Sequence, residues 1–252
     1  MKIKLSYLKS VHENAGGYYQ LAKETRQKIE GLEEAIKETQ KEMELATKEQ
    51  KKEIRVKREK EWFEKFHHMK TSSGLLAIGG RNVQQNDQLV SKHMTEADLF
   101  FHAEIQGAAV FILKEGVEKA TEKDLLEVAQ FAACFSNAWK NANASVDVYA
   151  AEKKQLTKNV SGGFVQAGAF AILGERKWFR GTKLLLRLGL LGGIASVLPE
   201  VSEQKLEKQL LIYPAASGKD KGSLAKSIAK RLSAHPDDLL SILPNGKSKT
   251  KE

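Results

Sequence analysis

Sulfur ligands are nearly absent from this chain of 252 residues. Cys134 is the only cysteine, which excludes an intramolecular disulfide and a cluster of thiolate metal ligands and fits a reducing, cytoplasmic environment. Apolar runs long enough to span a membrane are also missing. The stretch from Leu188 to Pro199, for example, falls short of the roughly 20 residues that a membrane span needs. We therefore expect no signal peptide, no transmembrane helix and no membrane partner.

Proline is scarce, with four in the chain and none between Ser10 and Trp62. In that stretch Glu, Lys, Gln and Ala dominate, which favours long helix over loop. Apolar or small residues alternate three and four positions apart, the a/d spacing of a coiled coil. They are Ile29, Leu32, Ile36, Thr39, Met43 and Ala46. This narrow seam predicts a partner helix: residues 48–62 folding back, a second copy (a homodimer), or a separate chain.

The chain is basic, with 41 Lys and Arg against 32 Asp and Glu and a formal net charge of +9. This balance favours polyanionic partners without distinguishing RNA, DNA and acidic membranes. Residues 48–60, KEQKKEIRVKREK, hold seven basic and three acidic side chains. They are interpreted either as a solvated helix face or as a face that follows a phosphate backbone.

The sequence changes in texture after residue 62, where glycine-bounded, strand-like runs alternate with amphipathic helices. This order predicts an α+β fold with a mixed, mainly antiparallel sheet and packed helices. We divide the chain into a helical coiled-coil arm (1–62), a globular domain (63–190), a C-terminal α/β extension (191–244) and a disordered basic tail (245–252).

A β-hairpin is expected first, from residues 63–69 and 75–78 around the turn at 71–74. A helix at 82–94 should begin with Asn82 as N-cap. Further strands are expected at 98–103, 109–113, 145–150, 169–173, 184–188, 194–198 and 209–213, and further helices at 122–141 and 221–232.

Two glycines mark the densest group of candidate binding residues, where a strand at residue 78 passes into a helix start. Gly79 and Gly80 permit close approach of the backbone, and the first amides of a helix are donors for a phosphate. The spacing is neither a P-loop nor a GxGxxG turn. The alternative interpretation is a tight structural turn.

Polar side chains follow this glycine pair. The Arg81 guanidinium is suited to a phosphate or to stacking on a base, and Asn82, Gln85 and Asn86 are suited to base edges or sugars. The alternative role for all four is to cap the helix and form the turn.

His102 ends an apolar strand beside Glu104, which suggests either an RNA contact, a structural histidine or, remotely, a metal-dependent hydrolase. Further ligands at metal spacing are missing, so we expect no metal and no cofactor. Ser136, Ser161 and Thr157 have no nucleophile elbow or paired base. The sequence therefore predicts a binding protein and not an enzyme.

Aromatic and basic residues are interleaved farther along the chain. Trp178 and Phe179 lie among Arg176, Lys177 and Arg180, a mixture that allows bases to stack while phosphates are neutralised. The alternative interpretation is a half-buried strand whose basic side chains point outward, because such a strand has the same residue pattern.

Several motifs in order resemble the NFACT-R domain of the NEMF, RqcH and fibronectin-binding-like proteins of ribosome-associated quality control. The resemblance spans about residues 62 to 180. It is carried by residues 61–66, 71–74, 78–86, 98–103, 107–108, 132–133, 136–139, 147–149, 157–162, 168–170 and 174. Residues 10–15 and 18–19 are similar to the coiled-coil segment that precedes this domain.

The resemblance implies binding to tRNA or rRNA on the large ribosomal subunit, and it adds Lys158, in the loop at 157–162, to the candidate RNA contacts. Gly162-Gly163-Phe164 depart from the acidic and aromatic residues usual in that loop. We expect a form without the NFACT-N module, in which template-free addition of alanine, or of alanine and threonine, to stalled chains depends on a partner. The alternative hypothesis is a coiled-coil scaffold that pairs with an NFACT-N-type chain or homodimerises.

Overall fold

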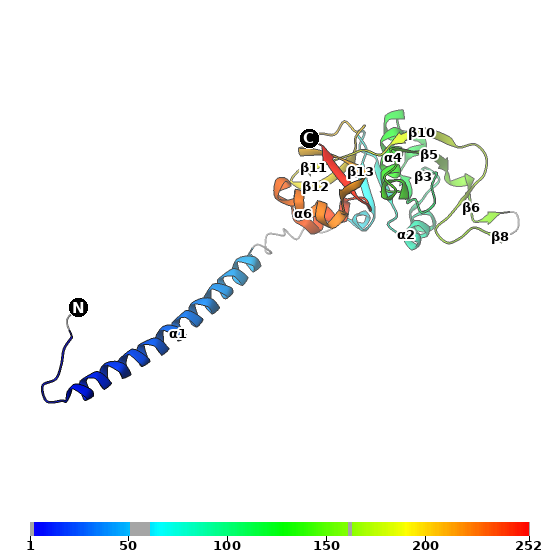
Figure 1. Cartoon of the computed structure of the whole chain (residues 1–252). Coiled ribbons are helices and arrows are strands. Elements are labelled where there is room, and N and C mark those ends of the chain that lie inside the picture. Colours follow the sequence, from blue (N-terminus) through cyan, green and yellow to red (C-terminus); the bar gives the residue numbers. More distant parts are fainter. Residues whose placement is uncertain (1–2, 51–60, 161–162, 252) are drawn as a thin grey trace. The chain divides into compact units, whose positions relative to one another are not determined.

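The chain divides into two compact units, Met1–Glu59 and Lys60–Glu252. The computed structural model describes residues 3–50, 61–160 and 163–251. The first unit holds one long helix and the second holds all of the described sheets (Figure 1). An α+β fold with a helical arm is therefore confirmed.

The first unit consists of α1 (Val11–Gln50) and the segment before it. A capping box starts the helix: the Ser10 amide donates to Glu13 Oε2 at 2.7 Å, and the Glu13 amide donates to Ser10 Oγ at 3.3 Å, which satisfies two amides that lack helical acceptors. The preceding segment folds back on α1, where the Tyr18 hydroxyl donates to the Lys4 carbonyl at 2.6 Å. The predicted helix is confirmed through residue 50, and the basic residues at 51–60 lie outside the described residues.

The second unit is built on a six-stranded sheet with the order β1-β2-β4-β3-β5-β10, in which all neighbours are antiparallel. The strands are β1 (His67–Lys70), β2 (Leu76–Gly79), β3 (Leu99–Ala103), β4 (Val110–Leu113), β5 (Ser145–Glu152) and β10 (Lys177–Lys183). The predicted hairpin is confirmed as β1 and β2, but residues 62–65 form a 3₁₀ turn, η1 (Trp62–Lys65), where a strand was expected. β10 is the last strand of this sheet and pairs with β5.

Side-chain alternation along these strands divides the core between two faces. Phe101 and Phe111 point to the face that α4 (Glu122–Cys134) covers. Phe100 and Ile112 point to the face beneath α2 (Val83–Gln88) and the π-helical turn η2 (Leu89–His93). Residues 153–160 and 163–174 add to this second face through Leu156, Phe170 and Ile172. They form η3 (Lys153–Gln155) and the two-stranded pairs β6 (Leu156–Thr157) with β9 (Ala171–Ile172) and β7 (Asn159–Val160) with β8 (Gly163–Phe164).

A second sheet, ordered β12-β11-β13-β14, closes the unit. Its strands are β11 (Leu186–Leu191), β12 (Ile194–Pro199), β13 (Glu207–Lys219) and β14 (Ser248–Lys251), and α6 (Lys221–Leu232) and α7 (Pro236–Ile242) pack beside it. Buried residues of this sheet, such as Leu188 and Ile212, share one hydrophobic cluster with α4. The expected boundary at 190/191 therefore falls inside a strand, and the C-terminal extension shares the core of the domain.

The prediction of a disordered tail at 245–252 is wrong for its described residues. β14 pairs with β13, with Lys249 opposite Tyr213. The buried indole of Trp139 donates from Nε1 to Ser248 Oγ at 2.9 Å, because a buried indole N–H needs an acceptor. Lysine-rich composition suggested disorder, whereas a backbone ladder and one side-chain bond hold this segment in place.

The remaining elements follow the sequence prediction closely. Strands expected around residues 99, 110, 145, 171, 186, 194 and 209 appear as β3, β4, β5, β9, β11, β12 and β13, and the helix at 221–232 is α6. The helix expected at 122–141 is interrupted, because Ser136 caps a new short helix, α5 (Asn137–Lys140). The sequence analysis did not predict α7 or the short helix α3 (Gly116–Lys119). Among the described helices none is long and apolar enough to cross a bilayer.

Candidate nucleic-acid interface

The glycine pair lies in a buried corner between the end of β2 and the start of α2. A Cβ on Gly79 would lie 2.3 Å from the Phe111 ring, and one on Gly80 would lie 2.1 Å from Asn86 Oδ1. The Gly80 amide donates to the Val110 carbonyl at 2.9 Å, and Asn86 Oδ1 accepts from the Val110 amide at 3.2 Å. Both glycines are therefore explained by close packing inside the domain.

Three amides around the helix start have acceptors within the protein. The Arg81 amide donates to Gln85 Oε1 at 3.0 Å, and the Gln85 amide donates to Asn82 Oδ1 at 2.9 Å. The Asn86 amide donates to the Asn82 carbonyl at 2.9 Å. The Gly80, Arg81, Gln85 and Asn86 amides are therefore engaged within the protein, whereas the Val83 and Gln84 amides at the start of α2 have no acceptor among the described residues. The expectation of a phosphate at this helix start stays a prediction.

Arg81 turns inward at this corner. Its guanidinium donates from Nη1 to the Ser241 carbonyl at 2.8 Å and from Nη2 to the Phe66 carbonyl at 3.1 Å. Burial lowers the pKa of Arg81, because desolvation disfavours the charged form. The side chain thus connects α7 to Phe66, the C-cap of η1, and it serves as a structural link.

His102 lies on β3 among aromatic neighbours. Its ring centroid is 6.2 Å from that of Phe100 and 5.8 Å from that of Tyr149. Burial lowers the pKa of His102 to about 4, so the ring is neutral at neutral pH. Glu104, which the hydrolase interpretation would pair with it, instead lies 3.7 Å from the guanidinium of Arg176.

The described residues also offer no group of three or more His, Cys, Asp or Glu side chains placed to hold a metal ion. The sequence had already left His102 and Glu104 without a third ligand. The donor set therefore gives the metal-dependent hydrolase no structural support.

A row of aromatic rings crosses three strands beside His102. His102 on β3 is opposite Tyr149 on β5, and Tyr149 is opposite Trp178 on β10. The Tyr149 and Trp178 ring centroids are 5.4 Å apart in an edge-to-face arrangement. Cross-strand neighbours on one face lie close enough for their side chains to interact, so the sheet register itself builds this row.

Two arginines lie over these rings. The Arg176 guanidinium carbon is 4.6 Å from the Tyr149 centroid, and the Arg180 guanidinium carbon is 3.8 Å from the Trp178 centroid. Both distances are within the range of a cation–π interaction. We call His102, Tyr149, Arg176, Trp178 and Arg180 the aromatic–arginine surface, in which Tyr149 is buried (6% exposed) beneath Arg176, the side chains of His102, Arg176 and Trp178 are half-buried, and Arg180 is exposed.

Strand alternation separates Lys177 from this surface. Arg176, Trp178 and Arg180 share one side of the chain, whereas Lys177 is directed to the other side, where its ammonium lies 2.5 Å from Glu122 of α4. Lys177 is adjacent to the arginines in the sequence, and the strand register that separates their side chains is not visible there. The structure does not bring them together.

Lys158 lies near α2 and does not belong to strands β3, β5 and β10, whose pairing builds the aromatic–arginine surface. Its ammonium forms an ion pair with Asp87 at 2.6 Å, donates to the Ala169 carbonyl at 2.7 Å and lies 3.9 Å from the centroid of the Phe170 ring. Asp87 also accepts from the Gly168 amide at 2.9 Å. Lys158 thus ties residues 153–174 to α2.

Except for Arg81, the predicted cations of this interface are paired with carboxylates. Arg180 lies 2.6 Å from Asp147, and Arg176, Lys158 and Lys177 have the partners given above. Residues 61–180 carry 14 Lys and Arg and 14 Asp and Glu, so this part of the chain has no formal net charge. Exposed ion pairs of this kind contribute little to stability, and a phosphate is therefore able to replace a carboxylate partner.

Tyr149 was not among the predicted binding residues. It appeared only as part of a motif at 147–149, within a run that reads as a strand. The signal that would have found it is its register opposite His102, and register between distant strands is not visible in one sequence.

Residues 65–174 match the family model of the NFACT protein RNA binding domain. The chain carries an NFACT RNA-binding domain. His102, Tyr149 and Lys158 lie inside the matched range, and Arg176, Trp178 and Arg180 follow directly after it. The aromatic–arginine surface is thus formed by this domain together with the next strand of the same sheet.

Curated relatives of this NFACT-containing chain are named for ribosome quality control. The archaeal Rqc2 homolog aRqcH of Methanocaldococcus jannaschii is 33% identical over 201 residues, which cover 76% of this chain and 30% of that protein. The ribosome quality control complex subunit NEMF homolog of Drosophila melanogaster is 34% identical over 190 residues, which cover 72% of this chain and 19% of that protein. The chain therefore spans less than a third of the length of these relatives.

One solved structure is also similar, the C-terminal part of the fibronectin/fibrinogen-binding protein from Streptococcus suis. It has 25% sequence identity and a TM-score of 0.41, and the match covers 51% of this chain and 49% of that chain.

Proposed function

We propose that this chain binds RNA through the aromatic–arginine surface and acts in ribosome-associated quality control. Two observations support the proposal: residues 65–174 match an RNA-binding family, and the relatives named above are ribosome quality control proteins. The observation that carries the assignment of the surface is the stacking of Arg180 on Trp178. tRNA and large-subunit rRNA are the proposed ligands.

The surface is suited to unpaired nucleotides. Unpaired RNA bases stack on aromatic rings and on guanidinium planes, whereas the bases of a duplex are not available for this. Trp178 supports one side of the Arg180 guanidinium, and the Arg180 side chain is 63% exposed. A base stacked on the open side of Arg180 would place its phosphate near Asp147, whose ion pair it would exchange for one with RNA.

A comparison of two single-charge variants tests this site. Arg180→Ala removes a cation from the aromatic side of β10, and Lys177→Ala removes one from the opposite side of the same strand. We expect Arg180→Ala to weaken binding to bulk tRNA or to large-subunit rRNA by about 1–3 kcal/mol, roughly 5- to 150-fold. Lys177→Ala should remain within about twofold of wild type.

Titrations of fluorescent RNA over a series of salt concentrations measure both affinity and electrostatic contribution. Trp178→Ala is a third variant, which keeps the charge of the surface and removes the ring beneath Arg180. Equal affinity losses for Arg180→Ala and Lys177→Ala would show that the surface acts only through overall charge. No loss for Arg180→Ala and Trp178→Ala would place the RNA site elsewhere.

A second candidate function is a coiled-coil scaffold, and the exposure of the α1 seam favours it. Ile29, Leu32 and Ile36 are 50%, 63% and 55% exposed within their unit. The hydroxyl of Thr39 donates to the Ala35 carbonyl at 2.8 Å, so its polar group is turned to its own helix backbone. Multi-angle light scattering measures pairing through this seam: a dimer that Leu32→Asp dissociates supports it, and a monomer that recruits no second chain opposes it.

A further inference from the structure

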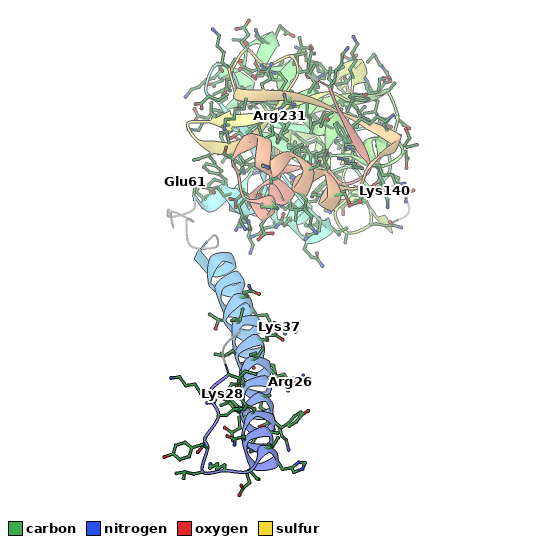
Figure 2. The ribbon with its side chains drawn as sticks, turned by 60° about the vertical axis from the view of Figure 1, so that its left-hand side comes forward. Arg26, Lys28, Lys37, Glu61, Lys140 and Arg231 are labelled. Atoms are coloured by element: carbon green, nitrogen blue, oxygen red, sulfur yellow. The ribbon has the colours of Figure 1, made fainter. Side chains whose placement is uncertain are left out.

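A cleft of about 520 Å³ lies where the C-terminal part of the chain meets the matched domain. Lys140 lines it from the end of α5, Lys221 from the first turn of α6, and Lys247 from the segment that leads into β14. These lysines are 107 positions apart at their extremes in the sequence, and the fold brings them to one cavity. Figure 2 shows Lys140 at the periphery of this unit.

The walls of this cleft are specified by close packing. Gly246 has a φ of +131°, and a Cβ there would lie 2.9 Å from Lys140 Cα. A side chain at this position would push the segment at 245–247 away from α5. The bond from Trp139 to Ser248 holds the same segment from the other side, so the spacing of Lys140 and Lys247 is fixed by the core.

The charge state of the cleft differs from that of the aromatic–arginine surface. Within the described residues, the ammonium groups of Lys140, Lys221 and Lys247 form no ion pair, and Lys221 donates only to Asn245 Oδ1 at 3.2 Å. Asp220 also lines the cleft, but its two oxygens accept from the amide and hydroxyl of Ser223 at 3.0 and 2.6 Å. The cleft thus presents three cations against one carboxylate that is already engaged as a helix cap.

The side chain of Lys221 is half-buried in the wall of the cleft. Burial and the positive charge of Arg81 both lower the pKa of Lys221, because each disfavours the ammonium form. An anion placed in the cleft would remove this penalty. Residues 181–252 as a whole carry 12 Lys and Arg against 7 Asp and Glu, whereas residues 61–180 are balanced.

We infer that this cleft binds the phosphodiester backbone of RNA. It is a second contact, separate from the aromatic–arginine surface, and it rests on the proposed RNA binding. Lysine ammonium groups bind phosphates as point charges without reading sequence. The cleft would therefore position RNA and contribute salt-dependent affinity, while the aromatic–arginine surface stacks on bases.

Two triple variants of the full chain test the inference. Lys140→Gln, Lys221→Gln and Lys247→Gln together neutralise the cleft. Lys226→Gln, Lys230→Gln and Lys251→Gln together remove the same charge from exposed positions of α6 and β14 outside it. Equal thermal unfolding temperatures for both variants and wild type will show that the fold is intact.

The measured quantity is the slope of log affinity against log salt concentration for bulk tRNA or large-subunit rRNA. Each phosphate contact contributes about 0.7 to 0.9 to this slope, so the cleft variant should lower it by about 2 to 3 and the control variant by less than about 1. Amine acetylation followed by mass spectrometry gives a second measurement. RNA should protect the three cleft lysines and leave Lys226 and Lys230 reactive.

Four outcomes overturn the inference, each in a recognisable way. If the cleft and control variants lower the slope equally, only general charge acts. If Arg180→Ala weakens binding but the cleft variant does not, the proposed function holds and the cleft has no part in it. If inorganic phosphate protects the three lysines from acetylation and RNA does not, the cleft is a site for free phosphate. Absence of any RNA binding by wild type refutes the proposed function as well.

Discussion

Substitution of Arg81 is the sharpest test of whether the glycine corner contacts RNA or has a structural role. The sequence places it directly after a glycine pair at a helix start, a position suited to an anion contact. The structure directs its guanidinium to the carbonyls of Ser241 and Phe66 at 2.8 and 3.1 Å. We predict that Arg81→Ala destabilises the fold and leaves RNA affinity of the folded protein within about twofold of wild type.

The magnitude follows from the two bonds that are lost. A hydrogen bond to a charged group contributes about 1.5–3 kcal/mol. Ser241 is exposed, so water will replace part of that bond, and we expect a total loss of about 2–4 kcal/mol in the free energy of unfolding. Arg81→Lys keeps the charge but cannot reach both carbonyls as a planar fork, and it should recover less than half of the loss.

Urea unfolding followed by circular dichroism measures this change. With an m-value near 2 kcal/mol/M, Arg81→Ala should lower the unfolding midpoint by about 1–2 M. RNA titrations are then made without urea, at a temperature where the variant is fully folded. An unchanged midpoint together with a tenfold or greater loss of RNA affinity would refute the structural role and restore Arg81 as an RNA contact.

Three further predictions address the neighbouring residues. Asp147→Asn should raise RNA affinity up to about fivefold in direct titrations, because it frees Arg180 from an ion pair worth at most about 1 kcal/mol; unchanged affinity would mean that Arg180 does not meet RNA. The pKa of His102 is lowered to about 4, so its neutral ring stabilises the fold above pH 6.5 and this contribution is lost as the pH falls from 6.5 toward 4. Between pH 6.5 and 4 the free energy of unfolding of His102→Gln should therefore fall by about 3 kcal/mol less than that of wild type, as measured by urea unfolding. Parallel pH profiles of the two proteins would contradict the burial of His102. Gly80→Ala should destabilise by about 2–4 kcal/mol in the same assay, since its Cβ would displace Asn86 from the Val110 amide, and a wild-type midpoint would exclude that packing.

Local signals in the sequence were sufficient for most of the fold. The hairpin of β1 and β2 and the capped start of α2 follow from turn residues and an N-cap that act within a few positions. α6 likewise begins after its cap Asp220. The predictions were wrong where contacts between residues far apart in the sequence determine the local structure. β14 is a strand because Trp139, more than a hundred positions earlier, holds Ser248, and composition at 245–252 contains no trace of that contact.

The candidate site was predicted only in part, for the same reason. Residue types identified Arg176, Trp178 and Arg180 as a stacking group, and the structure places their side chains on one side of β10. Tyr149 was missed and Lys177 was included, because both assignments depend on strand register. The amides of the glycine corner were assigned to a ligand because one sequence does not show which acceptors the fold supplies.

Net charge was the least informative guide to where RNA would bind. A formal charge of +9 favours a polyanionic partner but does not locate its site, and residues 61–180 carry equal numbers of basic and acidic side chains. The excess lies in residues 1–60, with 15 against 11, and in residues 181–252, with 12 against 7. A neutral surface with arginines held on aromatic rings has little long-range attraction for RNA and relies on stacking at contact. Under the proposed function, long-range attraction would come from the flanking segments, where phosphate contacts would set the salt dependence and the encounter rate. The proposed division is therefore a testable one: variants of the aromatic–arginine surface should change dissociation rates, and variants of the lysine cleft should change association rates and their dependence on salt.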